Sequence, residues 1–124
     1  MLDSEPLPIV EIRPRDEDRY SYEARYEIGR TEFSCPAELD EADEASVRDA
    51  ATRTWEALGC EGFARVDLIL AANGPQVLEV NAVPGLTDTS LFPMAAEAAG
   101  IGFEQLCNRI VSLAGARVAA FGGD

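Results

Sequence analysis

Three polar side chains interrupt an otherwise apolar stretch and could do chemistry together. In VDLILAANGPQVLEVN, residues 66–81, Asp67, Glu79 and Asn81 stand among aliphatic residues on both sides of an Asn-Gly turn signal. A charge buried in a sheet without a partner is costly, so these residues indicate a site rather than a core. Two carboxylates and a carboxamide oxygen are hard ligands of the kind that suit Mg²⁺.

The register of the hairpin decides whether these groups meet. Side chains alternate between the faces of a strand, so Arg65 shares a face with Asp67, and Glu79 shares a face with Asn81. A three-residue loop at 72–74, with its glycine in the left-handed conformation, would place Asp67 opposite Glu79 and Arg65 opposite Asn81. We therefore expect the four side chains to gather on one face.

Two other interpretations of the hairpin stay open. A two-residue Asn73-Gly74 turn would place Glu79 opposite Leu68 and send the polar groups to both faces. The groups could also line a solvent-facing surface on which Arg65 pairs weakly with the acids.

In the metal-binding arrangement, Mg²⁺ binds substrate phosphates through few protein ligands, which implies a nucleotide. Arg65 would then stabilise charge that develops on a phosphoryl or tetrahedral oxygen.

The segment VPGLTDTSL follows Asn81 directly. It contains a Pro-Gly turn and then a run of hydroxyl residues ahead of a predicted helix. Such a turn exposes backbone N–H groups next to the proposed metal, where they could hold an oxyanion or a carboxylate. An ordinary turn with a helix cap is the alternative.

The composition excludes several other kinds of site. The chain has no histidine, which excludes the common zinc sites and histidine-based triads. Its cysteines, Cys35, Cys60 and Cys107, are far apart and are expected to be buried free thiols. A net charge of −13 argues against a nucleic-acid surface. No stretch approaches the roughly 18 apolar residues that span a bilayer, and no signal peptide is evident, so a cytoplasmic protein is predicted.

The elements that must position these residues mix strands and helices without regular βαβ alternation, which predicts an α+β fold with an antiparallel sheet. A chain of 124 residues fits one domain, 1–124, with a frayed tail at 115–124. The expected elements are a strand at 7–13, a loop, an extended piece at 32–35, a helix from Leu39 to Leu58 with Gly59 as its cap, strands at 62–71 and 76–82, a short helix with Pro93 in its first turn, and a last helix from near Gly102. An apolar stripe is expected on the first helix, formed by Val47, Ala51, Trp55 and Leu58.

The succession GFARVDLIL, then LEVNAVPGLTDTSLFPMAAEAAGIGFEQL, resembles the C-terminal part of D-alanyl-D-alanine ligases, which are members of the ATP-grasp superfamily. PIVEI, YSYEARYEIGRTEFSCPA and the helix ending in WEALGC also resemble it. The match runs from about Pro8 to Ala114, and the ordered set RVD, EVN, PG and TSL is specific. The resemblance implies the C-terminal half of an ATP-grasp domain.

The resemblance also implies residue roles around the hairpin. Asp67, Glu79 and Asn81 would bind two Mg²⁺ ions that bridge the phosphates of ATP, with Glu79 as the bridging ligand and Mn²⁺ as a substitute metal. Arg65 and the backbone N–H of Gly85 would stabilise the oxyanion formed when the amine of one D-alanine attacks the acyl phosphate of another.

Further implied roles concern the substrates. Ser90 and the Leu91 backbone would hold the carboxylate of the second D-alanine. The stretch Tyr20 to Tyr26 resembles the mobile loop that closes over the site. Within it, Arg25 stands where the family commonly has a lysine that contacts phosphate, and Tyr26 would lie over the second substrate.

The implied function is ATP- and Mg²⁺-dependent joining of two D-alanines through an acyl phosphate, for peptidoglycan synthesis. The family's chains are far longer, so a missing N-terminal part of the ligase is an implied partner, and this chain alone is expected to have weak or no ligase activity. Apolar surface left by the missing half favours a homodimer. The alternatives are another ATP-grasp carboxylate–amine ligase, or a non-catalytic remnant that acts as a binding module.

Overall fold

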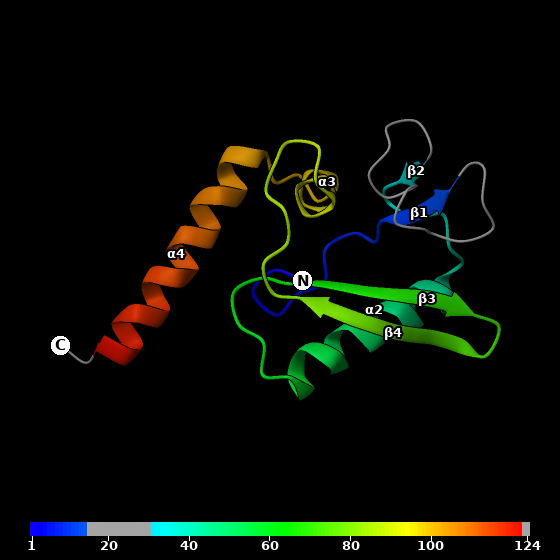
Figure 1. The fold of residues 1–124 in the computed structure, drawn as a ribbon, viewed down its shortest axis with the longest axis horizontal. Helices are drawn as coiled ribbons and strands as arrows, with labels where there is room; N and C mark the ends of the chain where they lie inside the picture. Colours follow the sequence, from blue (N-terminus) through cyan, green and yellow to red (C-terminus); the bar gives the residue numbers. More distant parts are fainter. Residues whose placement is uncertain (15–30, 123–124) are drawn as a thin grey trace.

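The computed structural model describes residues 1–14 and 31–122. Within these ranges, helices and two small antiparallel sheets confirm the α+β class. The elements are β1 (Glu11–Pro14), β2 (Thr31–Ser34), α2 (Glu41–Ala57), β3 (Arg65–Ala71), β4 (Gly74–Asn81), α3 (Leu91–Ala98) and α4 (Phe103–Gly122) (Figure 1). β1 pairs with β2, and β3 pairs with β4.

Helix α2 begins and ends where capping chemistry predicts. The Asp40 side chain accepts a hydrogen bond of 2.7 Å from the Asp43 N–H, and three acids in the first turn face the positive end of the helix. Gly59 follows the helix with φ 64, a left-handed value that favours glycine. Val47 and Trp55 are buried as expected, but Leu58 is 64% exposed, so the predicted stripe is wrong at its last position. Leu58 is the C-cap residue and lies beyond the last regular turn.

The β3–β4 hairpin lies across α2, and its loop is shorter than predicted (Figure 1). Ala71 pairs with Gly74, so Ala72 and Asn73 alone form the loop, and the prediction of a three-residue loop is wrong. Gly74 has φ 115, a backbone conformation that side chains rarely adopt. The same residue therefore serves the turn, but as the first paired residue of β4.

The core consists of two clusters that tie the N-terminal residues to the helices. Leu2 packs with Phe92 and Ala96 of α3 and with Leu106 of α4. Met1 packs with Trp55 of α2 and with Ala64, immediately before β3. Complete burial of one large aliphatic or aromatic side chain contributes about 1.5–3 kcal/mol. These two clusters connect the elements that carry the hairpin and the 82–90 loop.

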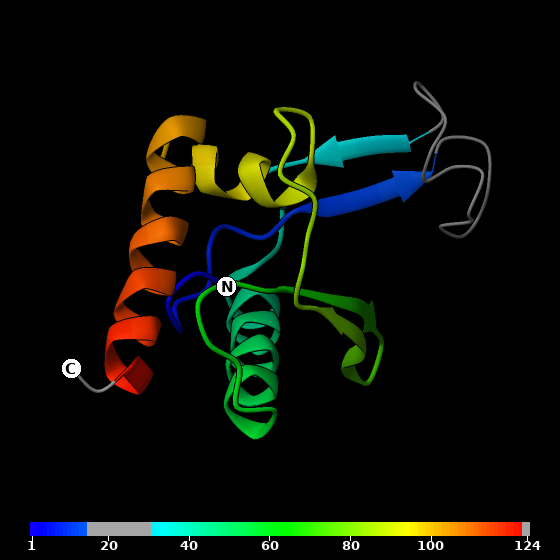
Figure 2. The ribbon, with the colours of Figure 1, turned by 60° about the vertical axis from the view of Figure 1, so that its left-hand side comes forward.

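The remaining element predictions differ from the structure mainly at their ends. The strand predicted at 7–13 is instead Glu11–Pro14, because pairing extends only as far as the short partner β2. Helix α3 has Pro93 in its first turn as predicted, and α4 starts at Phe103 beside it (Figure 2). Helix α4 extends to Gly122, through the segment for which the sequence predicts fraying. Fraying in solution stays a prediction.

Candidate functional site

The register brings the predicted polar residues of the hairpin together. Asp67 is the pairing partner of Glu79, and Arg65 is the partner of Asn81. Val66 and its partner Val80 pack on the cluster around Trp55 of α2. Because neighbouring residues of a strand point to opposite faces, the four polar side chains lie on the face that points away from α2.

A β-bulge places Glu79 on this face. Leu68 pairs with Val77 but Asp67 pairs with Glu79, so Leu78 is the extra residue on β4. With the two-residue loop and no bulge, Asp67 would stand opposite Leu78, and Glu79 would point toward α2. The predicted pairing is therefore present, but the extra residue lies at Leu78 rather than in the loop. Bulges occur beside active sites, where they redirect a side chain.

Arg65 and Asp67 form a two-pronged ion pair. Arg65 Nε donates to Asp67 Oδ1 at 2.7 Å, and Arg65 Nη2 donates to Asp67 Oδ2 at 3.0 Å. The two side chains are 27% and 26% exposed, so the pair is partly shielded from water. Each carboxylate oxygen has a second lone pair, so a metal ion can approach Asp67 without prior release of Arg65, although its charge would weaken the ion pair.

The other two oxygen donors of the hairpin, on Asn81 and Glu79, have different surroundings. Asn81 Oδ1 accepts a hydrogen bond of 2.9 Å from the Val83 N–H, and Glu79 is exposed. Across the described part of the chain, no group of three or more cysteine, aspartate, glutamate or histidine side chains could hold a metal ion. The site contributes two carboxylates, and a third protein ligand has to be the Asn81 amide. This hard-oxygen set fits Mg²⁺ with several of its positions filled by water or phosphate.

The loop after β4 holds a cluster of hydroxyl groups. The Thr87 N–H donates to Ser90 Oγ at 3.1 Å, and the Thr87 and Ser90 hydroxyl oxygens lie 2.6 Å apart. Ser90 is the N-cap residue of α3, yet its side chain makes no capping hydrogen bond. Its hydroxyl is thus turned into the loop, and the first N–H groups of α3, from Leu91 onward, are not capped by it. Uncapped N–H groups at a helix start are suited to bind a carboxylate.

Gly85 lies directly against Ser90. A Cβ placed on Gly85 would lie 3.0 Å from Ser90 Oγ and 3.5 Å from Ser90 Cβ. Only three residues separate Gly85 from Asn81 in the sequence. Gly85 and Ser90 therefore lie in one loop that follows the polar end of the hairpin, and Leu91 begins α3 directly after this loop.

Two predicted site residues lie outside this description. Arg25 and Tyr26 fall within 15–30, outside the described residues, and their roles stay predictions. One residue in the loop was missed by sequence reasoning: Thr87, whose hydroxyl contacts Ser90. The Thr-x-x-Ser spacing could have revealed it, because hydroxyl residues three apart in a turn often bond through side chain and backbone.

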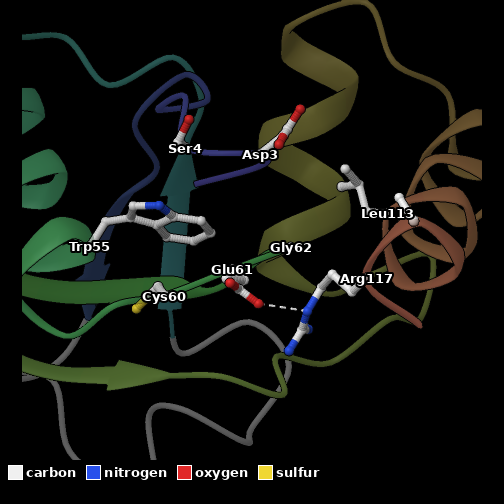
Figure 3. A pocket seen from close by; sticks show the side chains of 9 residues that line it. Asp3, Ser4, Trp55, Cys60, Glu61, Gly62, Leu113 and Arg117 are labelled. Carbon is white, nitrogen blue, oxygen red and sulfur yellow. Dashed lines mark ion pairs between the residues drawn. The ribbon is translucent and has the colours of Figure 1, made fainter. Parts of the chain in front are cut away.

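The cysteines are free thiols, as expected, although they are half-buried rather than buried. The Cys35 S–H donates weakly to the Met94 carbonyl at 3.9 Å, and burial raises the pKa of the Cys35 thiol. A cavity of about 340 Å³ lies elsewhere, between the N-terminal turn, the end of α2 and α4 (Figure 3). The Glu61–Arg117 ion pair, 2.7 Å long, crosses it. This cavity contains none of the predicted site residues.

No helix in the described ranges is both long and apolar enough to cross a bilayer.

Comparisons with known proteins agree along nearly the whole chain. Residues 2–112 match a family model described as the D-ala D-ala ligase C-terminus. The chain is 45% identical to a D-alanine–D-alanine ligase of Methylacidiphilum infernorum over 98% of its own length and 40% of the relative. It is 47% identical to one of Nitrosospira multiformis over 87% of its length and 35% of the relative.

The solved structures agree with the sequence relatives. The crystal structure of D-alanine–D-alanine ligase from Bacillus anthracis complexed with ATP matches with a TM-score of 0.81 and 35% identity, over 99% of this chain and 40% of that one. The chain thus spans about 40% of the length of such relatives. Both its sequence and its fold therefore place the chain in the D-ala D-ala ligase C-terminus family.

Proposed function

We propose that this chain provides the metal-binding and amide-forming half of an ATP-dependent D-alanine–D-alanine ligase. The observation that carries the proposal is the pairing of Asp67 with Glu79 beside Arg65 and Asn81, followed at once by the Gly85–Ser90 loop. The Bacillus anthracis relative has been solved with ATP, which supports a nucleotide as the phosphoryl donor. The rest of the nucleotide site would come from the N-terminal part that the longer relatives contain.

The oxygen donors of the hairpin would hold Mg²⁺, with Mn²⁺ as a substitute. Asp67 and Glu79 supply carboxylates and Asn81 an amide oxygen, and we propose that Glu79 contacts both of two ions. Bound there, the metal would offset negative charge during phosphoryl transfer from ATP to the carboxylate of the first D-alanine. Arg25 would add positive charge at the ATP phosphates.

The second step joins the two amino acids. The amine of the second D-alanine attacks the acyl carbon, the bond from this carbon to the phosphate oxygen breaks, and the amine loses a proton as the amide and inorganic phosphate form. Arg65 and the Gly85 N–H would stabilise the oxyanion of this step. Ser90 and the Leu91 N–H would hold the carboxylate of the attacking D-alanine, and Tyr26 would cover it and exclude water.

Reconstitution tests this function. The chain is mixed with the separately purified N-terminal portion of the Methylacidiphilum infernorum relative, and ADP and D-alanyl-D-alanine are measured with Mg-ATP and D-alanine. We expect activity from the mixture and little from either part alone. Asp67→Asn or Glu79→Gln should reduce turnover at least about 100-fold, since each removes metal charge from the transition state. Asp88→Asn, an exposed acid in the adjacent loop, is the matched control and should leave turnover unchanged.

Substrate choice has a separate test. Ser90→Ala should raise KM for the second D-alanine in this ligase, whereas another ATP-grasp carboxylate–amine ligase with the same metal site but a different substrate element would be little affected. A mixture that turns over Mg-ATP but makes no D-alanyl-D-alanine would contradict the proposed substrate. The relatives reported above are D-alanine–D-alanine ligases, which supports this substrate over the other hypotheses.

Two further parts of the proposal concern the state of the chain. Consumption of ATP supports a cytoplasmic location. Exposed apolar side chains on β4 and α4, which are Leu78, Val111 and Val118, support homodimer formation by the isolated chain. Sedimentation equilibrium over a range of concentrations tests the dimer, and a monomer at every concentration would exclude it.

A further inference from the structure

Thr87 and Ser90 close a tight turn immediately before α3. The Ser90 N–H donates to the Thr87 carbonyl at 3.1 Å, so residues 87–90 form a β-turn. The Thr87 N–H donates back to Ser90 Oγ at 3.1 Å, and the two hydroxyl oxygens lie 2.6 Å apart. Three hydrogen bonds therefore connect these two residues, and two of the three involve the Ser90 hydroxyl.

The direction of the bond between the two hydroxyls decides what Ser90 can bind. A serine hydroxyl has one proton to donate and two lone pairs that accept. The Thr87 N–H occupies one of these lone pairs. If the Thr87 hydroxyl donates its proton, the second lone pair is filled and the Ser90 proton is left for a ligand. If Ser90 donates instead, its proton is used and one lone pair is left to accept.

A carboxylate selects the first of these directions. An ionised carboxylate only accepts hydrogen bonds, so with the 2.6 Å contact in place it can bind Ser90 only while Thr87 donates. Hydrogen bonds in a chain strengthen one another, so donation by Thr87 also makes the Ser90 O–H a better donor. The Thr89 hydroxyl lies 3.4 Å from that of Thr87 and can donate to it, which extends the chain in the same direction.

We propose that Thr87 is a positioning residue of the ligase reaction, which acts through Ser90 and selects a carboxylate on the second amino acid. With its N–H and its O–H it fills both lone pairs of the Ser90 hydroxyl, which leaves Ser90 able only to donate. A second substrate that presents a hydrogen-bond donor at this point is then disfavoured. The inference rests on the proposed function, in which Ser90 holds the carboxylate of the second D-alanine.

A competition between two second substrates tests this role. The reconstituted mixture, made with the N-terminal portion of the Methylacidiphilum infernorum relative, receives Mg-ATP, D-alanine and D-alaninamide. D-alaninamide has no carboxylate to be phosphorylated, so it enters only as the attacking amine, and its carboxamide both donates and accepts hydrogen bonds. Mass spectrometry gives the ratio of D-alanyl-D-alanine to D-alanyl-D-alaninamide. Because the same active molecules make both products, this ratio does not depend on how much of a variant is folded.

Thr87→Val removes the hydroxyl but keeps the shape of the side chain and the backbone N–H. Ser90 then has an open lone pair to which a carboxamide N–H can donate, and it loses the donation that favours a carboxylate. We expect the product ratio to fall about fivefold or more, the effect of about one hydrogen bond. Thr87→Ser keeps the hydroxyl, is the matched control, and should give the ratio of the unsubstituted chain. An unaltered ratio in Thr87→Val would overturn the proposal.

A Ser90→Ala background tests whether Thr87 acts through Ser90. There, Thr87→Val should change the ratio by less than about twofold, because the hydroxyl that Thr87 orients is gone. Equal effects in both backgrounds would assign Thr87 a structural role in the loop and overturn the proposal. Failure of Thr87→Ser to keep the ratio would also overturn it. So would the absence of the amide product from both the unsubstituted chain and Thr87→Val.

The outcomes separate this inference from the enzymatic one. A mixture that makes neither product refutes the proposed function, and the role of Thr87 falls with it. A mixture that makes D-alanyl-D-alanine, with the same product ratio for the unsubstituted chain and Thr87→Val, supports the activity and refutes the role of Thr87 alone.

Discussion

At the scale of single residues, the site depends on close contacts whose identity the sequence shows only in part. Alternation along the strands predicts that Arg65 shares a face with Asp67 and that Glu79 shares a face with Asn81, but whether the two pairs meet depends on the register. The contact between Thr87 and Ser90 was not predicted, because it depends on the path of a loop with no periodic pattern.

The packing of Gly85 on Ser90 gives a prediction for stability. Gly85→Ala places a methyl group 3.0 Å from Ser90 Oγ, so Ser90 has to move, at a cost of about 1 kcal/mol in the free energy of unfolding. Urea denaturation measures this cost. In a Ser90→Ala background the nearest atom is the Ser90 Cβ position at 3.5 Å, an ordinary contact, and the cost should largely disappear. Additive effects of the two substitutions would show that the contact does not exist.

The buried α-amine of Met1 gives a prediction for pH. Burial lowers the pKa of this amine from 8.0 to about 6, so in this range the unfolded chain binds more protons than the folded chain. With respect to this amine, the free energy of unfolding is highest above pH 8, declines as the pH falls, and reaches its lower limit below pH 6. The loss is at most about 2.7 kcal/mol, two pKa units at 1.36 kcal/mol each.

Chemical denaturation between pH 5.5 and 8.5, at about half-unit steps, measures this dependence. Adding one residue before Met1 converts the amine to an amide and should flatten this part of the profile. An unchanged profile would assign the pH dependence to other groups.

At the scale of elements, capping residues and apolar periodicity predicted the helices and strands, but they did not predict the loop length or the bulge of the β3–β4 hairpin. Helix α2 was predictable from Asp40 and Gly59, which have strong positional preferences. The loop of the β3–β4 hairpin was not, since Ala72-Asn73-Gly74 suits more than one turn and a bulge has no composition signal of its own. The loop is one residue shorter than predicted, and the unpredicted bulge adds one residue to β4. The two errors cancel, so Asp67 still pairs with Glu79.

Deletion of Leu78 tests the position of the bulge. This residue is unpaired and 62% exposed, so its removal should close the bulge, keep Asp67 opposite Glu79 and change stability by less than about 1 kcal/mol. Backbone NMR contacts between the strands measure the register. A shift of Glu79 to the position opposite Leu68 would show that the extra residue lies elsewhere.

At the scale of the whole molecule, few large side chains hold the helices to the hairpin. Leu106 is fully buried and joins α4 to Leu2 and to Phe92 of α3. The apolar residues of α4 differ in burial, since Leu106 is fully buried whereas Val111 is 71% exposed. Helix periodicity shows two apolar stripes on α4, and only the packing partner decides which one is covered.

Leu106→Ala should destabilise the chain by about 2–5 kcal/mol, because it leaves a cavity at the junction of α3 and α4. Val111→Ala, on the exposed side of the same helix, is the matched control and should change stability by less than about 0.5 kcal/mol. Thermal unfolding followed by circular dichroism compares the two. Similar losses would mean that the second stripe of α4 is also buried in solution.

The fork of Arg65 on both oxygens of Asp67 has a consequence for the order of events in the proposed reaction. A divalent cation that binds Asp67 competes with the guanidinium for the same carboxylate, so its arrival would loosen Arg65 toward the oxygen that becomes negative later. Arg65→Gln should then tighten Mn²⁺ binding to the chain, read by electron paramagnetic resonance, while slowing amide formation in the reconstituted mixture. Weaker Mn²⁺ binding would exclude this competition. Before a metal ion binds, the Arg65 guanidinium would neutralise Asp67, and only after metal binding would it turn to the oxyanion of the second step.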